Sequence, residues 1–165
     1  MNRNILIASS IVLMFGFAAI LTLSNKAPND TSISVTPTQT PAPIKRIEIT
    51  LGQQTLSYYS DDTLVNTIKI SSGLPRTPTP IGTFTVLDKI PTKDYIGKNL
   101  DGTWYDLKNT QWNLRFSNLG YYIHGAYWHN NFGHPMSHGC INVSYADMPQ
   151  LYEFADLGTL IVIKQ

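Results

Sequence analysis

One cysteine and four histidines lie close together in the second half of the chain. His124, His129, His134 and His138 fall within 15 residues, and Cys140, the only cysteine, follows two positions later. A free thiol has a pKa of about 8.5 and is only a few per cent thiolate at neutral pH, so a thiol nucleophile needs a neighbouring base. The cluster predicts nucleophilic catalysis by Cys140, with a neighbouring imidazolium that lowers the thiol pKa until the thiolate dominates.

His124 is the base that the local pattern favours. It ends a predicted strand, and Cys140 follows after an excursion of 15 residues that can return its side chain to the strand end. Gly139, directly before the thiol, permits a tight turn and close approach of a substrate. The amides of that turn are candidate oxyanion donors.

Other interpretations of these residues stay open at this point. A lone cysteine can be a buried small hydrophobic residue, and a group of histidines with a cysteine can bind zinc. The spacing contains no compact pair such as CxxC or HExxH, so we predict neither a metal nor a cofactor. Tyr127 and Trp128 serve either packing or binding, and Trp128, His129 and Phe132 could line a lid over a substrate. His129 and His134 otherwise have no assigned role.

The elements expected to position the pair are mostly short strands, because polar and apolar residues alternate between turn signals. The predicted strands are Lys45–Leu51, Thr55–Ser60, Thr63–Ile70, Gly82–Leu87, Trp104–Leu107, Asn113–Phe116, Tyr121–His124 and Thr159–Ile163. Residues 88–102 are rich in turn formers and receive no element. One helix is expected after the nucleophile, over Tyr145–Phe154, capped by Ser144 with Asp147 three residues on. We therefore predict a mostly β domain, a β-sandwich or a mixed β-fold with one helix.

The N-terminal part of the chain predicts export. Ile5–Leu23 is an apolar run of 19 residues behind Arg3, long enough for a transmembrane helix, with a cleaved signal peptide as the alternative. Residues 24–43 are rich in Pro, Thr, Ser and Asn and predict an extended tether. The expected organisation is an anchor or signal in residues 1–23, a tether in 24–43 and a catalytic domain in 44–165.

Charge excludes one class of function. The 12 basic and 11 acidic residues leave a net charge of +1, so the chain lacks the basic field of a nucleic-acid-binding protein. The nine Tyr, six Phe and three Trp instead suit a β-rich core or a groove for an extended ligand.

Two separated motifs resemble the YkuD-type L,D-transpeptidases. The first is His124, a spacer of twelve residues that begins with Gly125, and then Ser137-His138-Gly139-Cys140-Ile141-Asn142. The second lies upstream, where Ser72-Gly73 precedes Thr77-Pro78-Thr79-Pro80-Ile81-Gly82-Thr83-Phe84. The resemblance covers about residues 44–165, in the same order. It implies that Cys140 is the nucleophile and His124 the general base.

The resemblance also implies roles for the neighbours of this pair. The backbone carbonyl of Gly125 would orient the His124 ring. His138 and Gly139 would shape the oxyanion hole, and Ser137 and Asn142 would support the loop by hydrogen bonds. Asn142 stands where many relatives have Arg.

The implied reaction takes place on peptidoglycan stem peptides in the bacterial cell envelope, outside the cytoplasm. Cys140 would attack the third residue of a tetrapeptide stem, release D-alanine and form a thioester, which an amine of a second stem would convert to a 3→3 cross-link. Attack by water would make the protein an L,D-carboxypeptidase, and carbapenems would be expected to acylate the thiol. A cysteine peptidase of the NlpC/P60 type places Cys before His, opposite to this chain. A non-catalytic wall-binding module would have no need of the Cys–His pair.

Overall fold

A computed structural model describes residues 42–165, and these form one mixed β-sheet with a single α-helix. The sheet order is β4-β9-β1-β2-β3-β8-β7-β6-β5. The bounds of the strands are Lys45–Thr50 (β1), Thr55–Ser60 (β2), Thr63–Ser71 (β3), Gly82–Thr85 (β4), Asp88–Lys98 (β5), Trp104–Arg115 (β6), Tyr122–Ala126 (β7), Ile141–Ser144 (β8) and Leu160–Lys164 (β9). A 3-10 turn, Leu51–Gln53, joins β1 to β2, and the helix α1 spans Met148–Phe154.

The first three strands form the antiparallel meander that the alternating pattern predicts. In β1 the alternation places Ile47 and Ile49 in the core, and β9 pairs parallel to it with Ile161 and Ile163 on the same side. Further along the sheet, Ile123 of β7 joins this hydrophobic core. Burial of these β-branched side chains supplies the main stabilisation of the sheet.

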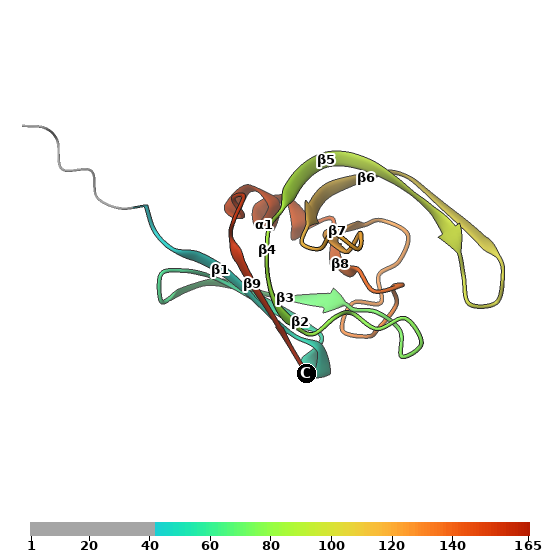
Figure 1. The fold of residues 1–165 in the computed structure, drawn as a ribbon, viewed down its shortest axis with the longest axis horizontal. Coiled ribbons are helices and arrows are strands. Elements are labelled where there is room, and N and C mark those ends of the chain that lie inside the picture. Colours follow the sequence, from blue (N-terminus) through green and yellow to red (C-terminus); the bar gives the residue numbers. More distant parts are fainter. Residues whose placement is uncertain (1–41) are drawn as a thin grey trace, which may run out of the picture. The chain divides into compact units, whose positions relative to one another are not determined.

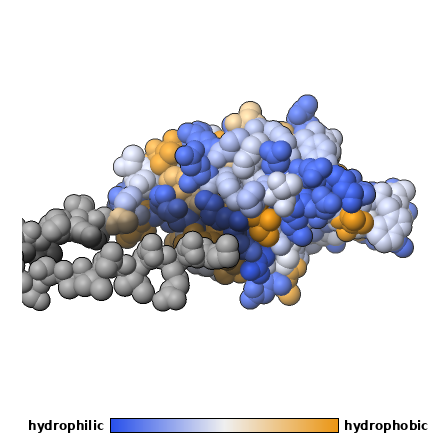
Figure 2. Space-filling view, turned by 90° about the horizontal axis from the view of Figure 1, so that it is seen from above, coloured by the Kyte–Doolittle hydropathy of each residue, from blue (hydrophilic) through white to orange (hydrophobic). Residues whose placement is uncertain are grey.

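The mostly β class with one helix is confirmed, but the sandwich interpretation is wrong. The strands form one continuous hydrogen-bonded sheet that curls, with the β5–β6 hairpin arching over β7 and β8 (Figure 1). On the face seen in Figure 2, the described residues are mostly hydrophilic, with hydrophobic side chains in small separate patches.

The long hairpin departs most from the strands predicted by sequence. Residues 88–98 form β5 despite their turn formers, since β5 is an edge strand and an edge tolerates the missing N–H of Pro91. Residues 104–115 form one strand, β6, where two were expected. Asn109 and Trp112 have positive φ values of 54° and 57°. These bends interrupt the alternation, which is why the pattern predicts two separate strands.

Around the nucleophile, the structure adds β8 and shortens the helix. Ser144 Oγ accepts a hydrogen bond from the Asp147 amide at 3.1 Å, as a cap would, but residues 145–147 form a turn. The α-helix begins at Met148, with Pro149 in its first turn, where a proline is tolerated.

The predicted anchor and all but the last two residues of the predicted tether lie outside the described residues. Within residues 42–165 the one α-helix has seven residues, too few to cross a membrane.

Candidate active site

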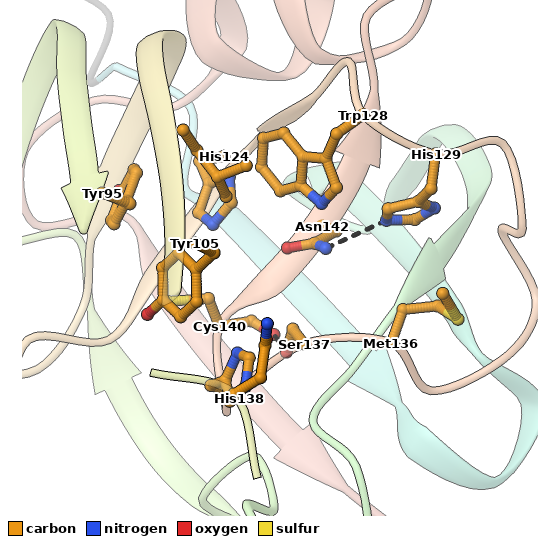
Figure 3. Close-up of a pocket in the computed structure, with 12 residues that line it drawn as sticks. Tyr95, Tyr105, His124, Trp128, His129, Met136, Ser137, His138, Cys140 and Asn142 are labelled. Carbon is orange, nitrogen blue, oxygen red and sulfur yellow. Dashed lines mark hydrogen bonds between the residues drawn. The ribbon is translucent and has the colours of Figure 1, made fainter. Parts of the chain in front are cut away.

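A pocket of about 310 Å³ opens where the β5–β6 hairpin faces the start of β8. Both His124 and Cys140 line it (Figure 3). His124 lies on β7 and Cys140 directly precedes β8, and β7 pairs parallel to β8 with His124 opposite Asn142. Paired residues leave a sheet on the same side, and Cys140 lies two residues before Asn142, so all three side chains face the pocket.

His124 is held in one orientation and one tautomer. Its ring is 3% exposed, and Nδ1 lies 3.0 Å from the backbone oxygen of Gly125. A carbonyl oxygen only accepts, so Nδ1 carries the proton and donates, which leaves the lone pair on Nε2. A side chain at Gly125 would collide with the ring of Tyr145, 2.6 Å from the added Cβ. The glycine therefore lets the backbone pass close to Tyr145.

Burial favours the neutral form of both His124 and Cys140. It lowers the pKa of His124 to about 4, and the hydrogen bond to Gly125 only partly offsets this. It raises the pKa of Cys140 to about 11, against a backbone hydrogen bond with Tyr122 and the charge of Lys93. Both shifts oppose the resting thiolate beside an imidazolium that the sequence pattern predicts, and they favour a neutral thiol beside a neutral imidazole.

The turn before Cys140 is closed by hydrogen bonds of Ser137. Its Oγ accepts from the Gly139 amide at 3.0 Å and donates to the backbone oxygen of Cys140. Gly139 has a φ of 114°, and an added Cβ would lie 2.5 Å from the Tyr121 ring. Because the Gly139 N–H is already bonded, Gly139 contributes the shape of the turn, and its own amide is not a free oxyanion donor.

The upstream motif braces this same turn. Thr79 Oγ1 accepts from the Gly73 amide at 2.9 Å and donates to the Gly139 carbonyl at 3.0 Å. Thr77 Oγ1 and the Leu74 amide both donate to the Ser137 carbonyl. Two segments about 60 residues apart in sequence thus form one support for the nucleophile.

The hairpin contributes pocket residues that the sequence reasoning missed. Tyr95 stacks on the His124 ring with centroids 4.8 Å apart, and its hydroxyl donates to Asn113 Oδ1 at 2.8 Å. Tyr105 stacks on His138 at 5.1 Å. The pocket-facing hairpin residues are Tyr95, Asn99, Tyr105 and Leu107. The alternate spacing of Tyr105 and Leu107 within β6 is the signal that could have found these two.

Only some residues of the loop after β7 line the pocket. Trp128 lines the pocket, with its ring 5.8 Å from that of His124. Tyr127 and Phe132 do not line it. Tyr127 is half exposed and donates to the Lys108 carbonyl, and Phe132 packs on His129. His129 lines the pocket, whereas His134 is exposed outside it.

Among residues 42–165, no three His, Cys, Asp or Glu side chains lie close enough together to hold a metal ion. The zinc interpretation therefore has no ligand cluster in that range.

Comparison with known proteins gives concordant matches. Residues 44–163 match the YkuD family, described as the L,D-transpeptidase catalytic domain. The chain is 30% identical over 118 residues to the putative L,D-transpeptidase YkuD of Bacillus licheniformis, covering 72% of this chain and 64% of that protein. Over 101 residues it is 31% identical to the probable L,D-transpeptidase 3 of Mycobacterium tuberculosis, covering 58% of this chain and 37% of that protein. The chain thus spans between about a third and two thirds of these curated relatives.

Two solved structures share the fold. L,D-transpeptidase 3 of Mycobacterium tuberculosis, in complex with a faropenem-derived adduct, superposes with a TM-score of 0.68 at 26% identity, covering 74% of this chain and 61% of that one. The catalytic domain of the Enterococcus faecium L,D-transpeptidase superposes with a TM-score of 0.63 at 31% identity, covering 75% of this chain and 99% of that domain.

Proposed function

The chain belongs to the YkuD family of L,D-transpeptidase catalytic domains, and on this premise we propose that it is a peptidoglycan L,D-transpeptidase acting through a Cys140 thioester. The observation that carries the proposal is the His124 tautomer. Its Nδ1–H donates to Gly125, which leaves the lone pair of Nε2 free to accept a proton. The same pocket contains Cys140, the only thiol of the chain.

The neutral resting pair defines the order of proton transfers. As the sulfur of Cys140 attacks the carbonyl carbon of the third stem residue, its proton passes to His124 Nε2. The resulting imidazolium then gives that proton to the amine of the departing D-alanine as the C–N bond breaks and the thioester remains. An acceptor amine next attacks the thioester and loses a proton to Nε2, which returns it to the sulfur as the new amide forms.

The remaining residues support these steps. Tyr95 stacks on the ring of His124 and Gly125 accepts its hydrogen bond, and together they keep the ring in the reactive orientation. We assign the oxyanion role to the amide of Cys140 itself, since that of Gly139 in the same turn is engaged. Trp128 and the hairpin tyrosines wall the pocket and reduce the access of water to the thioester.

The location follows from the substrate. A peptidoglycan substrate places the domain outside the cytoplasm of a bacterial cell, with residues 1–23 as the proposed anchor or signal and residues 24–43 as the proposed tether. L,D-carboxypeptidase activity is the alternative outcome of the same thioester, because water and amine compete for it.

The test combines intact mass with product analysis on the purified protein. Incubation with a tetrapeptide stem should give a Cys140 acyl-enzyme with release of D-alanine, and then cross-linked dimer in excess over tripeptide. A carbapenem should add once to the wild type and not to Cys140→Ala. His124→Gln should keep the fold and slow acylation by about a hundredfold or more.

Three results would contradict the proposal in different ways. Tripeptide as the main product at every acceptor concentration would reassign the protein as a carboxypeptidase. An acyl group that survives in Cys140→Ala would exclude the thiol as nucleophile. Retention on peptidoglycan without any turnover, unchanged after alkylation, would favour a wall-binding module.

A further inference from the structure

His129 and Asn142 form a polar pair on the wall of the pocket, beside the catalytic residues (Figure 3). Asn142 is 2% exposed and lies on β8 directly opposite His124. Its Nδ2 lies 3.0 Å from His129 Nε2, and its Oδ1 is buried with no hydrogen-bond partner within residues 42–165. A buried polar atom without a partner is costly, and a ligand group, a bound water or a different orientation of the carboxamide can compensate it.

The hydrogen bond at Nδ1 of His129 determines whether His129 or Asn142 donates in this pair. The backbone N–H of Asn131 donates to His129 Nδ1 at 3.2 Å. A nitrogen that accepts a hydrogen bond carries no proton, so the proton of the neutral ring lies on Nε2. Burial lowers the pKa of His129, which keeps the ring neutral at physiological pH.

An Nε2–H group needs an acceptor, and the amide nitrogen of Asn142 cannot be one. The two ends of a carboxamide have nearly the same shape, so the hydrogen-bond network decides which end faces which partner. Here it requires the oxygen of Asn142 to face His129. The NH2 group then occupies the buried position in which no donor reaches the oxygen, among residues that line the pocket.

We propose that His129 is a positioning residue, which turns the Asn142 carboxamide so that its NH2 group donates a hydrogen bond into the pocket. The partner is an oxygen of the bound stem peptide, either a backbone carbonyl or the terminal carboxylate. This inference rests on the proposed function and adds a recognition element to the same site. Trp128 and Phe132 pack against the His129 ring, with centroids at 6.1 and 4.8 Å, and hold it in place.

The tautomers provide a test that needs no catalysis. In protein labelled with 15N at histidine, a long-range 1H–15N correlation spectrum reports which ring nitrogen carries the proton. His129 should be protonated at Nε2 and His124 at Nδ1, so one spectrum should contain both patterns. The His129 signals are identified by their loss in His129→Gln. A proton on Nδ1 of His129 would overturn the proposal, whether or not the protein is a transpeptidase.

Substrate kinetics test the consequence for binding. His129→Phe keeps an aromatic ring against Trp128 and Phe132 but has no N–H, so the KM of a tetrapeptide stem should rise about tenfold. The rate at which iodoacetamide alkylates Cys140 should change far less. In His129→Gln the side-chain amide can replace Nε2–H and should restore most of the affinity.

The matched control is His134→Phe, an exposed histidine of the same loop that does not line the pocket. It should keep the wild-type KM. Equal KM values for His129→Phe and His134→Phe would overturn the proposal, as would a failure of His129→Gln to exceed His129→Phe. An absence of turnover in the wild type would instead reject the proposed function, and the tautomer measurement would still decide the orientation of Asn142.

Discussion

His124 and Cys140 are neutral at rest for the same reason, because the walls of the pocket remove water from both. A neutral thiol reacts more slowly in alkylation and oxidation, since the thiolate is the reactive form. The substrate carbonyl then supplies the driving force for proton transfer during attack. Burial raises the pKa of Cys140, and the positive charge of Lys93 opposes this by lowering it.

At the residue scale, we expect Lys93→Met to make Cys140 less reactive. The ammonium of Lys93 lies over the rings of Tyr95 and Tyr122, 5.3 and 5.7 Å from their centroids, and its charge lowers the pKa of the thiol. Its removal should raise that pKa further and slow alkylation at pH 7 about two- to fivefold.

The measurement is the rate of iodoacetamide labelling against pH, with Lys98→Met as control. Lys98 is exposed on the same hairpin and lies over Trp104, 5.1 Å from the ring centroid. Lys93→Arg should stay close to the wild type. Identical profiles for Lys93→Met and the wild type would show that the charge of Lys93 does not reach the sulfur.

At the scale of elements, the β5–β6 hairpin positions aromatic rings over residues of β7 and of the turn before β8. Its register pairs Gly97 with Tyr105. A Cβ at Gly97 would lie 2.5 Å from the Tyr105 hydroxyl and 2.6 Å from the ring carbon that bears it. The absent side chain of Gly97 therefore leaves the space in which Tyr105 lies against His138.

Gly97→Ala should displace Tyr105 and lower kcat/KM for the stem peptide about tenfold or more, because small displacements in an active site are costly. The stability should change little, since Gly97 has no positive φ and lies at the sheet edge. Gly52→Ala, whose Cβ would meet its nearest atom at 3.7 Å, is the matched control. Unchanged kinetics in Gly97→Ala would remove Tyr105 from the working site.

At the scale of the whole molecule, the catalytic histidine is also part of the core. All five residues of β7 are buried, and this strand lies between β6 and β8 inside the curled sheet (Figure 1). Folding therefore transfers His124 from water to a site that disfavours its protonated form. Titration and stability are linked at this residue.

We expect stability to fall as the pH is lowered from 6.5 towards 4. In that window the unfolded chain binds a proton at His124, whose ordinary pKa is 6.5, while the folded protein, with a pKa of about 4, does not. The unfolded state binds more protons, so the free energy of unfolding decreases by up to about 1.4 kcal/mol per pH unit, about 3 kcal/mol in total. His129 contributes with the same sign, because burial lowers its pKa too.

Denaturant unfolding between pH 5 and 7 measures this slope above the range in which most carboxylates titrate. His124→Gln should lose most of the slope, and His134→Gln, in which an exposed histidine is replaced, should retain it. Equal slopes in all three proteins would contradict the buried neutral imidazole.

For the fold, the sequence alone determined the strands with regular alternation. The β1–β2–β3 meander was predictable because polar and apolar residues alternate in β1 and short turns separate the three strands. β9 was predictable from its short apolar run, and β4 from its place after the Pro-rich loop. The pattern does not determine how strands associate, so both a sandwich and a mixed β-fold were predicted, and one curled mixed sheet forms. It also fails where a bulge and positive φ values interrupt the period, as in β5 and β6.

For the site, the sequence alone pointed to Cys140 and His124, because a lone thiol that follows clustered histidines and a glycine is typical of nucleophilic catalysis. It could not supply the burial of the pair, which depends on walls contributed by distant segments such as Tyr95 and Tyr105. For that reason a thiolate was expected, whereas burial raises the pKa of Cys140 and favours the neutral thiol. Nor could it assign a role to His129, whose partners Asn131 and Asn142 meet only after the loop has folded back on β8. Residue chemistry is local and readable in sequence, whereas pKa values and hydrogen-bond orientation depend on three-dimensional neighbours, which only the tertiary structure decides.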